Sequence, residues 1–323
     1  MKKLLSVLML CVLVFTPVFA QGIKEQNKIK ANEITEINFA VLAGPTGMGA
    51  AQLSQNDGMI SDDLKVNMRV FSAVSDVTVE ILKGEEDVAA ISTNLAAILF
   101  NKGINIKIAA TICDGMMYVL SSEVEDVSQL IGKKLSLAGG PLGTPKYLTD
   151  IILDANGYND DDIECDYGVK SAQQLASLVI AGKIKHAILT EPFATVVCKK
   201  NPNVKKIYSL QEGYKDATGL ENYPMAVLVV KDEFAQEHPS ELKSFMNSYK
   251  KSVSFVVNNP EASGKLIEDC GIMKKEMAVP SIPNCNLTFK TGSMDEINSY
   301  YERMYDFNVN SIGGSVPTKD FYL

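Results

Sequence analysis

Two glycine-rich turns, about a hundred residues apart in the chain, carry groups suited to holding a small molecule. The first is Pro45-Thr46-Gly47-Met48, which follows an apolar run, and the second contains Gly143-Thr144 after another apolar run. A strand that breaks at glycine and then opens a helix leaves free backbone N–H groups at the start of the helix. Each turn is therefore a candidate polar socket. The alternative is that the glycines only allow a tight turn between strand and helix.

Polar side chains at the ends of two predicted strands extend this set. Ser92, Thr93 and Asn94 follow a buried run, and Glu191 follows another. Hydroxyl and amide groups at the carboxyl end of a strand can face a ligand, or they can cap the next helix. The Glu191 carboxylate could attract an amine or a ring N–H, or it could only stabilise the start of the next helix.

The scarcity of arginine narrows the ligand class. Arg69 and Arg303 are the only arginines, and neither lies on a proposed pocket loop. Planar oxyanions such as nitrate, and sulfonates, are best held by a bidentate guanidinium. We therefore expect a neutral or cationic nitrogen heterocycle, with the aromatic rings Phe193, Tyr118 and Tyr223 available either for stacking or for the core.

Catalytic and metal-binding groups are poorly represented, so we expect no catalytic residues, metal or cofactor. His186 and His238 are the only histidines, and we expect His186 to be a strand or surface residue. The acidic stretch 159–166 lacks the glycine and ligand spacing of a calcium loop and reads as a solvated turn. The widely spaced cysteines fit no zinc pattern and are expected to be small buried side chains, with a Cys270–Cys285 disulfide left open.

The elements that position these residues form an internal repeat. Ile81-Leu82-Lys83-Gly84 leads into the strand before Ser92, and Ile180-Ala181-Gly182 leads into the strand before Glu191. Each copy reads strand, glycine turn, helix, strand, helix, strand. Ligand sites lie outside the carboxyl ends of parallel strands, so two such copies predict two α/β lobes whose turns face each other across a cleft.

Hydrophobic patterning sets the expected boundaries of the elements. Ser75 and Ser171 are predicted helix N-caps at matching places in the two copies, and the chain after residue 232 is predicted to be mostly helical and to pad the first lobe. The expected strands are 35–42, 64–71, 88–92, 104–111, 116–122, 163–168 and 225–230, and the expected helices are 48–56, 77–83, 144–155, 172–181, 240–257, 260–270 and 294–307.

Length and composition agree with a two-domain globular protein. The chain has 323 residues, of which 46% are hydrophobic and 22% charged. The net charge of −8 and the absence of a basic stripe argue against nucleic-acid binding. We expect lobe 1 to comprise residues 34–119 and 225–323, and lobe 2 to comprise residues 120–224.

The first 20 residues have the pattern of a secretory leader. Two lysines precede an apolar run, and Val18-Phe19-Ala20 offers a cleavage site after Ala20. A retained membrane anchor is the alternative, but the run is shorter than a span requires. Cys11 lies inside this run and is a poor site for a lipid. We expect a periplasmic protein without a lipid anchor, and a disordered lead-in at residues 21–33.

Several short motifs follow one another along the chain. They are the Leu82–Ala89 segment with Gly84 and Asp87, Leu130-Ile131-Gly132-Lys133-Lys134, Gly143-Thr144, Ala181-Gly182, Glu191-Pro192, Pro239-Ser240-Glu241-Leu242 and Asn259-Pro260-Glu261. In this order they resemble a known family, the bacterial solute-binding proteins for sulfonates, nitrate and thiamine precursors. One departure is His186-Ala187, because the family usually has aspartate before this alanine.

The resemblance implies the type II periplasmic-binding-protein fold, in which each lobe is a mostly parallel sheet flanked by helices and two strands form the hinge. It also implies a monomeric receptor that closes on one small ligand and docks on the membrane permease of an ATP-driven (ABC) importer. A thiamine or pyrimidine precursor is favoured over a sulfonate or nitrate. The alternatives are an enzyme of the same fold, pyrimidine-forming or lyase-type, and a periplasmic sensor. The residues implied to line the cleft are Pro45, Thr46, Gly47, Met48, Ser92, Thr93, Asn94, Gly143, Thr144 and Glu191.

Overall fold

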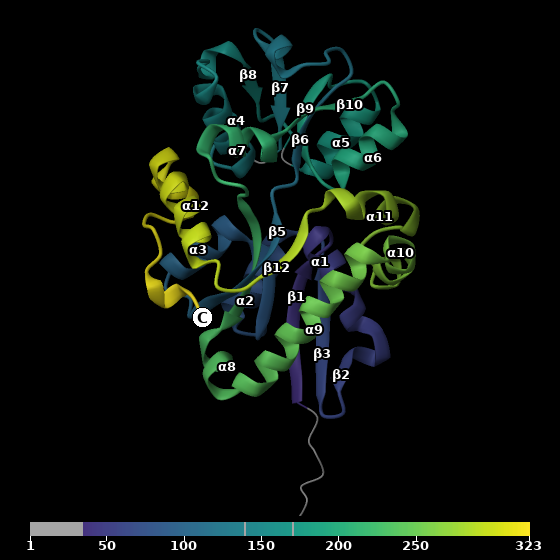
Figure 1. Ribbon diagram of the computed structural model, residues 1–323, viewed down its shortest axis with the longest axis vertical. Helices are drawn as coiled ribbons and strands as arrows, with labels where there is room; N and C mark the ends of the chain where they lie inside the picture. The colour runs from purple at the N-terminus through teal and green to yellow at the C-terminus, as the bar shows by residue number, and fades with distance from the viewer. Residues whose placement is uncertain (1–34, 139, 170) are drawn as a thin grey trace, which may run out of the picture. The chain divides into compact units, whose positions relative to one another are not determined.

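A computed structural model describes residues 35–138, 140–169 and 171–323 of the chain (Figure 1). The predicted leader (1–20) and lead-in (21–33) lie outside the described residues. None of the helices in the described ranges combines the length and the apolar character that crossing a membrane requires. The described part contains two β-sheets. We call the part built on the first sheet lobe 1 and the part built on the second sheet lobe 2.

The lobe 1 sheet has seven strands in the order β12-β5-β11-β4-β1-β3-β2. Its centre is apolar, because β4 and the middle of β1 and β11 are buried. Strand β1 runs parallel to β3 and β4, whereas β11 runs antiparallel to β4 and β5. The strands are β1 (Thr35–Leu42), β2 (Met59–Ser61), β3 (Leu64–Phe71), β4 (Val88–Ser92), β5 (Ile106–Asp114), β11 (Pro224–Lys231) and β12 (Leu287–Lys290).

The lobe 2 sheet has five strands in the order β10-β6-β9-β7-β8. Strand β7 runs parallel to β8 and β9, whereas β6 runs antiparallel to β9 and β10. The strands are β6 (Met117–Ser121), β7 (Lys134–Leu137), β8 (Glu164–Asp166), β9 (His186–Thr190) and β10 (Lys205–Ser209).

Both sheets are therefore mixed, and the prediction of mostly parallel sheets is corrected in this respect. The antiparallel pairs include β6 and β11, each the first strand that the chain forms after it passes from one sheet to the other. The first passage lies at Gly115-Met116, between β5 and β6, and the second at residues 219–223, before β11. The predicted two-stranded hinge has its counterpart in these two connections. Because β6 pairs only with lobe 2 strands, the first passage precedes the predicted boundary at residue 120.

Helices cover both faces of the sheets (Figure 1). The helices of lobe 1 are α1 (Pro45–Ala50), α2 (Val74–Lys83), α3 (Thr93–Asn101), α8 (Asp232–Glu237), α9 (Pro239–Asn258), α10 (Pro260–Asp269), α11 (Lys275–Ser281) and α12 (Met294–Phe307). Those of lobe 2 are α4 (Thr144–Ala155), α5 (Ala172–Ile180), α6 (Phe193–Lys200) and α7 (Leu210–Thr218). Short 3₁₀ helices are η1 (Ala51–Gly58), η2 (Val127–Leu130), η3 (Asp160–Asp162), η4 (Ile282–Asn284), η5 (Val309–Ile312) and η6 (Lys319–Phe321).

Helix α9 shows how the sequence pattern builds the lobe 1 core. Its buried side chains include Leu242, Phe245, Tyr249 and Val253, which recur every three or four residues and so form one face of the helix. Phe245 meets Phe39 of β1 edge to face, with ring centroids 5.1 Å apart. Fully burying one such side chain contributes about 1.5–3 kcal/mol. This face therefore fixes α9 on the sheet beside α1.

The predicted N-caps have different outcomes. Ser171 caps α5, since its Oγ accepts a hydrogen bond from the Gln174 N–H at 3.5 Å. Ser75 does not cap α2, because the helix already begins at Val74 and the Ser75 hydroxyl donates instead to Asp76. Asp76 supplies the acidic group of the first turn there. The matching serines of the two copies thus have different roles.

Candidate ligand-binding site

A cavity of about 680 Å³ is lined by both lobes at the carboxyl ends of β1, β4 and β9. Lobe 1 contributes the ends of β1 and β4, the start of β11 and the loop between α10 and α11. Lobe 2 contributes the end of β9 and the starts of α5 and α6, and Met116 comes from the first connection. The lining residues are Leu42–Thr46, Ser72, Val74, Ser92, Met116, Ser171–Gln173, Thr190–Phe193, Met225, Ala226 and Gly271–Met273. This is the place that the repeat predicts for a ligand.

A second hollow, of about 600 Å³, lies at the other end of β4 and is formed by lobe 1 alone. Its walls include Glu86, Lys231 and Glu233, and Lys231 Nζ already pairs with Glu233 at 2.7 Å. We place the candidate site in the first cavity, because both lobes contribute to its wall and because strand ends converge there.

Four of the ten predicted site residues line the cavity, namely Pro45, Thr46, Ser92 and Glu191. Thr46 lies in the first turn of α1, where its hydroxyl donates to the Leu42 carbonyl at 3.3 Å. Ser92 is at the N-cap position of α3, but its side chain makes no capping hydrogen bond. Of the two roles predicted for Ser92, the cavity position is therefore the one that the geometry provides.

The other residues of the first turn and of the β4 end lie outside the cavity wall. A Cβ at Gly47 would approach the Leu42 carbonyl oxygen to 2.7 Å, so glycine serves close packing there. Met48 is buried, with its Sδ 3.9 Å from Cys285 Sγ. Thr93 is buried and its carbonyl accepts a hydrogen bond from the Tyr301 hydroxyl at 2.8 Å. Asn94, one residue further into α3, does not line the cavity.

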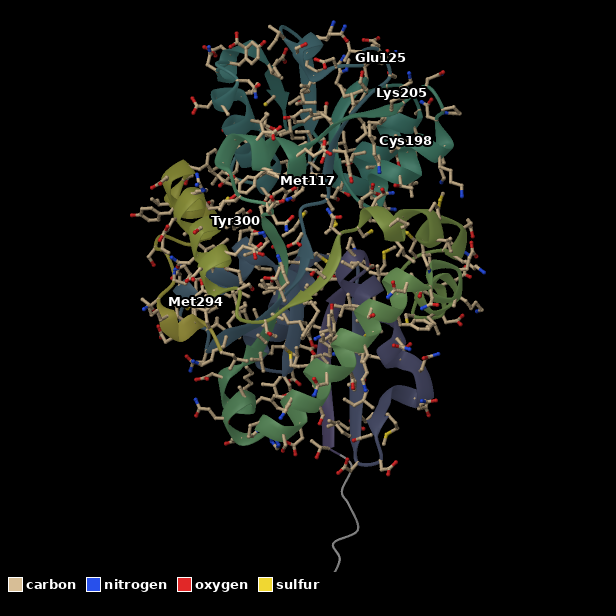
Figure 2. The ribbon with its side chains drawn as sticks, viewed as in Figure 1. Met117, Glu125, Cys198, Lys205, Met294 and Tyr300 are labelled. Atoms are coloured by element: carbon tan, nitrogen blue, oxygen red, sulfur yellow. The ribbon has the colours of Figure 1, made fainter. Side chains whose placement is uncertain are left out.

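The second glycine turn faces α12 instead of the cavity. Gly143 is at the N-cap position of α4, and the Thr144 hydroxyl lies 3.5 Å from the Tyr300 hydroxyl. Figure 2 marks Tyr300 on α12, on the side of the molecule away from α6. The expectation that the two glycine turns face each other across one hollow is therefore corrected for the described residues, among which the first turn lines the cavity and Gly143 and Thr144 do not.

The Glu191 carboxylate is engaged within lobe 2. Its side chain has no exposed surface, and it forms an ion pair with Lys206 of β10. Thr195 of α6 donates to it twice, from the backbone N–H at 3.2 Å and from the hydroxyl at 3.0 Å. Lys206 Nζ also lies 4.2 Å from the centre of the Tyr118 ring. The negative charge is thus neutralised and stabilises the start of α6, which is the alternative role foreseen for Glu191.

The rest of the described wall carries no charged side chain. Hydroxyl and amide groups come from Thr46, Ser72, Ser92, Ser171, Gln173 and Thr190, and apolar surface comes from Leu42, Pro45, Val74, Met116, Phe193, Met225, Ile272 and Met273. Of the three rings considered for stacking, only Phe193 lines the cavity. Tyr118 lies under Lys206, and Tyr223 is buried against Tyr214 and Tyr300.

The sequence matches the family described as NMT1/THI5-like over residues 61–263, more than half of its length. The chain belongs to the NMT1/THI5-like family. No curated protein matched it in a sequence search. The family resemblance predicted from the short motifs is therefore confirmed.

Solved structures confirm the fold of this NMT1/THI5-like protein. An ABC transporter protein from Parabacteroides distasonis is 23% identical, with a TM-score of 0.78 over 90% of this chain and 99% of that chain. The periplasmic aliphatic sulphonate binding protein SsuA from Escherichia coli is 12% identical, with a TM-score of 0.71 over 88% and 90%. A Candida albicans gene product described as having the generic periplasmic binding protein fold is 13% identical, with a TM-score of 0.57 over 89% and 93%.

His186 and the cysteines are the other side chains of this NMT1/THI5-like chain that carry reactive groups. His186 begins β9, and its Nδ1 lies 3.0 Å from the Ser121 hydroxyl, which also accepts two backbone N–H groups. Burial lowers the pKa of His186. Cys270 and Cys285 form no disulfide with each other. The described residues contain no cluster of metal ligands.

Sequence reasoning missed most of the wall. Ser171 was recognised as a cap, but its place beside the cavity was not. Met116 and Met225 gave no polar signal, although Met116 is part of the first hinge connection and Met225 lies just after the second. Gly271–Met273, between α10 and α11, come from a part of the chain with no counterpart in the repeat.

Proposed function

We propose that this protein is the extracytoplasmic receptor of an ABC importer and that it binds a neutral nitrogen heterocycle in the cavity between its lobes. The similarity to the Parabacteroides ABC transporter protein and to the Escherichia periplasmic binding protein supports the receptor role. The leader predicted at residues 1–20 supports export to the periplasm.

The neutral wall is the observation that carries the ligand class. A cationic ligand would need an available carboxylate, but Glu191 is already paired with Lys206 and Thr195. A sulfonate or nitrate is best held by a guanidinium, but no described lining residue is basic, so such an anion would rely on hydroxyls and on the N–H groups of helix starts alone. Hydroxyl and amide groups can satisfy the polar edge of a neutral ring, while Phe193 and the methionines can cover its faces.

A ligand panel tests the proposal. The purified protein is mixed with uracil, cytosine, riboflavin, thiamine, an alkanesulfonate or nitrate, and thermal unfolding is followed. A ligand at a hundred times its dissociation constant stabilises the fold by about 2.7 kcal/mol, which corresponds to a Tm increase of roughly 4 °C for a protein of this size. We expect neutral rings to give this shift. A shift with the sulfonate, nitrate or thiamine alone would refute the ligand class.

Variants of two glutamines test whether the ligand binds in this cavity. Gln173 lines the cavity, whereas Gln236 is on α8 and donates to Asp232 at 2.9 Å, away from this wall. Replacing Gln173 with leucine should weaken the selected neutral ligand about two- to twelve-fold, the worth of one hydrogen bond, and Gln236→Leu should leave affinity unchanged in isothermal titration calorimetry. Mass spectrometry of the same mixtures would detect turnover, which would favour an enzyme over a receptor.

A further inference from the structure

The two lobes meet on opposite sides of the cavity through contacts of different chemistry. On one side, Tyr147 of α4 packs edge to face on Tyr300 of α12, with centroids 5.8 Å apart, and also contacts Phe307. Both tyrosines are almost fully buried. On the other side, α6 of lobe 2 meets α11 and η4 of lobe 1 through polar groups. There Lys199 Nζ donates to the Glu276 carbonyl at 2.9 Å, and Asn284 Nδ2 donates to Thr195 Oγ1 at 3.2 Å.

This difference predicts which side separates when the cavity opens. Exposing the aromatic contact would bring a large apolar area into water, at a cost of about 25 cal/mol for each Å². Polar contacts lose less, because water replaces the partner of each group. The α6–α11 side is therefore the side that opens, and its hydrogen bonds form when the lobes close.

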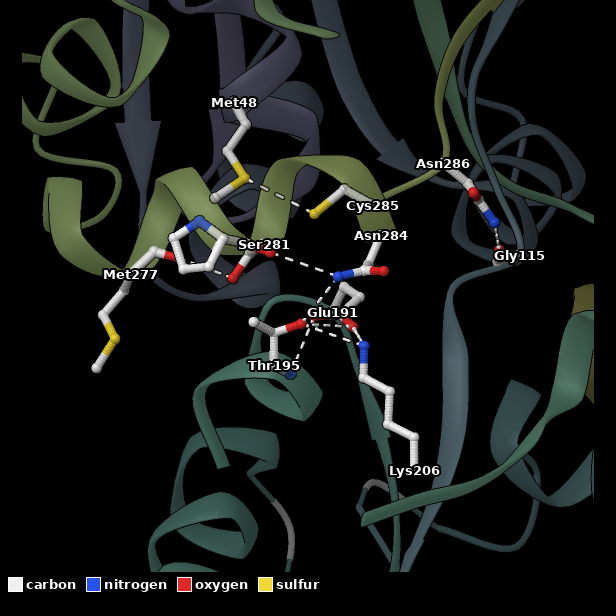
Figure 3. Close-up of polar contacts among 11 residues, drawn as sticks. Met48, Gly115, Glu191, Thr195, Lys206, Met277, Ser281, Asn284, Cys285 and Asn286 are labelled. Atoms are coloured by element: carbon white, nitrogen blue, oxygen red, sulfur yellow. Dashed lines mark hydrogen bonds and ion pairs between the residues drawn. The ribbon is translucent and has the colours of Figure 1, made fainter. Parts of the chain in front are cut away.

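The Thr195 hydroxyl is the central group of that side (Figure 3). It donates to Glu191 Oε1 at 3.0 Å, and it accepts from Lys206 Nζ and from Asn284 Nδ2, each at 3.2 Å. One donated and two accepted hydrogen bonds use the full capacity of a hydroxyl. Lys206 and Glu191 belong to lobe 2, whereas Asn284 is supplied by lobe 1 and is the partner that lobe opening would remove.

We propose that the hydrogen bond from Asn284 to Thr195 is the closure contact of the two lobes, and that Thr195 is a positioning residue that connects closure to the cavity wall. Glu191, which Thr195 holds through its backbone N–H and its hydroxyl, lies within the wall segment Thr190–Phe193. Closure of lobe 1 onto Thr195 thus completes the network that fixes this segment. The inference rests on the two-lobed receptor role proposed above, but not on the identity of the ligand.

The test measures the distance between the lobes in the ligand-free protein. Spin-labelled unnatural amino acids at Lys251 of α9 and at Lys183 after α5, both exposed, report this distance by pulsed electron spin resonance. Labels on cysteine are unsuitable because the described residues already include five cysteines, which would compete for the label. Asn284→Ala should lower the ratio of closed to open protein about two- to twelve-fold, the effect of one hydrogen bond.

A matched control separates the contact between lobes from a local effect. Asn284 Nδ2 also reaches the Pro280 carbonyl four residues earlier, at 3.4 Å, and Asn258 Nδ2 makes the same kind of local contact to the Ser254 carbonyl at 2.8 Å without touching lobe 2. Asn258→Ala should leave the distance distribution unchanged. Thr195→Val removes the acceptor from lobe 2 and should open the protein as Asn284→Ala does.

Two results would overturn the inference. One is a distance distribution in Asn284→Ala and Thr195→Val that equals that of the wild type, and the other is an equal shift in Asn258→Ala. Circular dichroism of each variant confirms that it is folded. Because the measurement needs no ligand, a failed ligand panel and a failed closure contact give separate readouts.

Discussion

Replacing Lys206 with methionine should lower the free energy of unfolding by about 2–4 kcal/mol, because Glu191 would remain as a buried carboxylate without its cation. The Glu191 side chain has no exposed surface, and that of Lys206 is 24% exposed. Removing one partner of a buried ion pair costs about 3–5 kcal/mol. We expect a somewhat smaller loss here, since Thr195 still donates two hydrogen bonds to the carboxylate. Methionine retains most of the apolar stem that lies near Tyr118.

Two further variants fix the interpretation of that loss. Glu191→Gln should cost less than Lys206→Met, because the freed ammonium can turn toward water whereas the freed carboxylate cannot. Lys205→Met is the matched control: Lys205 precedes Lys206 in β10, pairs with Glu125 at 2.6 Å, and both side chains are largely exposed (Figure 2). We expect no resolvable change from it.

Urea denaturation followed by circular dichroism measures all three variants, since the chain has no tryptophan for fluorescence. The reasoning would be refuted if Lys206→Met were no more destabilising than Lys205→Met. It would also be refuted if Glu191→Gln cost as much as Lys206→Met, because the asymmetry follows from the different exposure of the two partners.

Two other predictions concern lobe 1 and the hinge. Burial raises the pKa of Glu86 from 4.5 to about 7, opposed by its ion pair with Arg69. Folded protein therefore keeps a proton that unfolded protein releases, so the stability contributed by this group falls as the pH rises from about 4.5 to 7. Glu86→Gln should flatten the pH profile of the urea midpoint, and parallel profiles would contradict this account. Gly115→Ala, in the first hinge connection, would place a methyl group into Gln211 and Tyr223 and should destabilise the fold by about 1–3 kcal/mol. Gly140→Ala, where a Cβ meets no neighbour, is its control in the same denaturation assay, and equal stability of the two variants would show that the connection adapts.

Local patterns were sufficient to predict the central strands. The bounds of β1, β3 and β4 agree with the prediction, because each is an apolar or alternating run that ends at a turn signal. Strands β2, β10 and β12 were missed. Strand β10 reads Lys-Lys-Ile-Tyr-Ser and β12 reads Leu-Thr-Phe-Lys, so both are short and partly polar, and they lie at sheet edges where burial gives only a weak pattern.

The missed strand β10 also explains why the sequence left the charge of the site open. The sequence places Glu191 correctly at the end of β9 and beside the cavity. Its partner Lys206 is on β10, which reaches β9 only through β6 between them in the sheet. A free carboxylate at a strand end predicts a cationic ligand, whereas a neutralised one does not. The ligand class therefore depended on a long-range pairing that no local spacing reveals.

The two glycine turns show how far an internal repeat predicts a site. The repeat correctly places both turns at strand ends that lead into α1 and α4. The surroundings of each turn come from outside the repeat: Ile272 packs near Gly47, and Tyr300 of α12 lies against Thr144. Helix α12 belongs to the C-terminal part of the chain, and of the two turns it contacts the second, at Thr144. Similar sequences therefore have different neighbours. A repeat thus predicts the backbone that it encodes, whereas the contacts of that backbone depend on the rest of the chain.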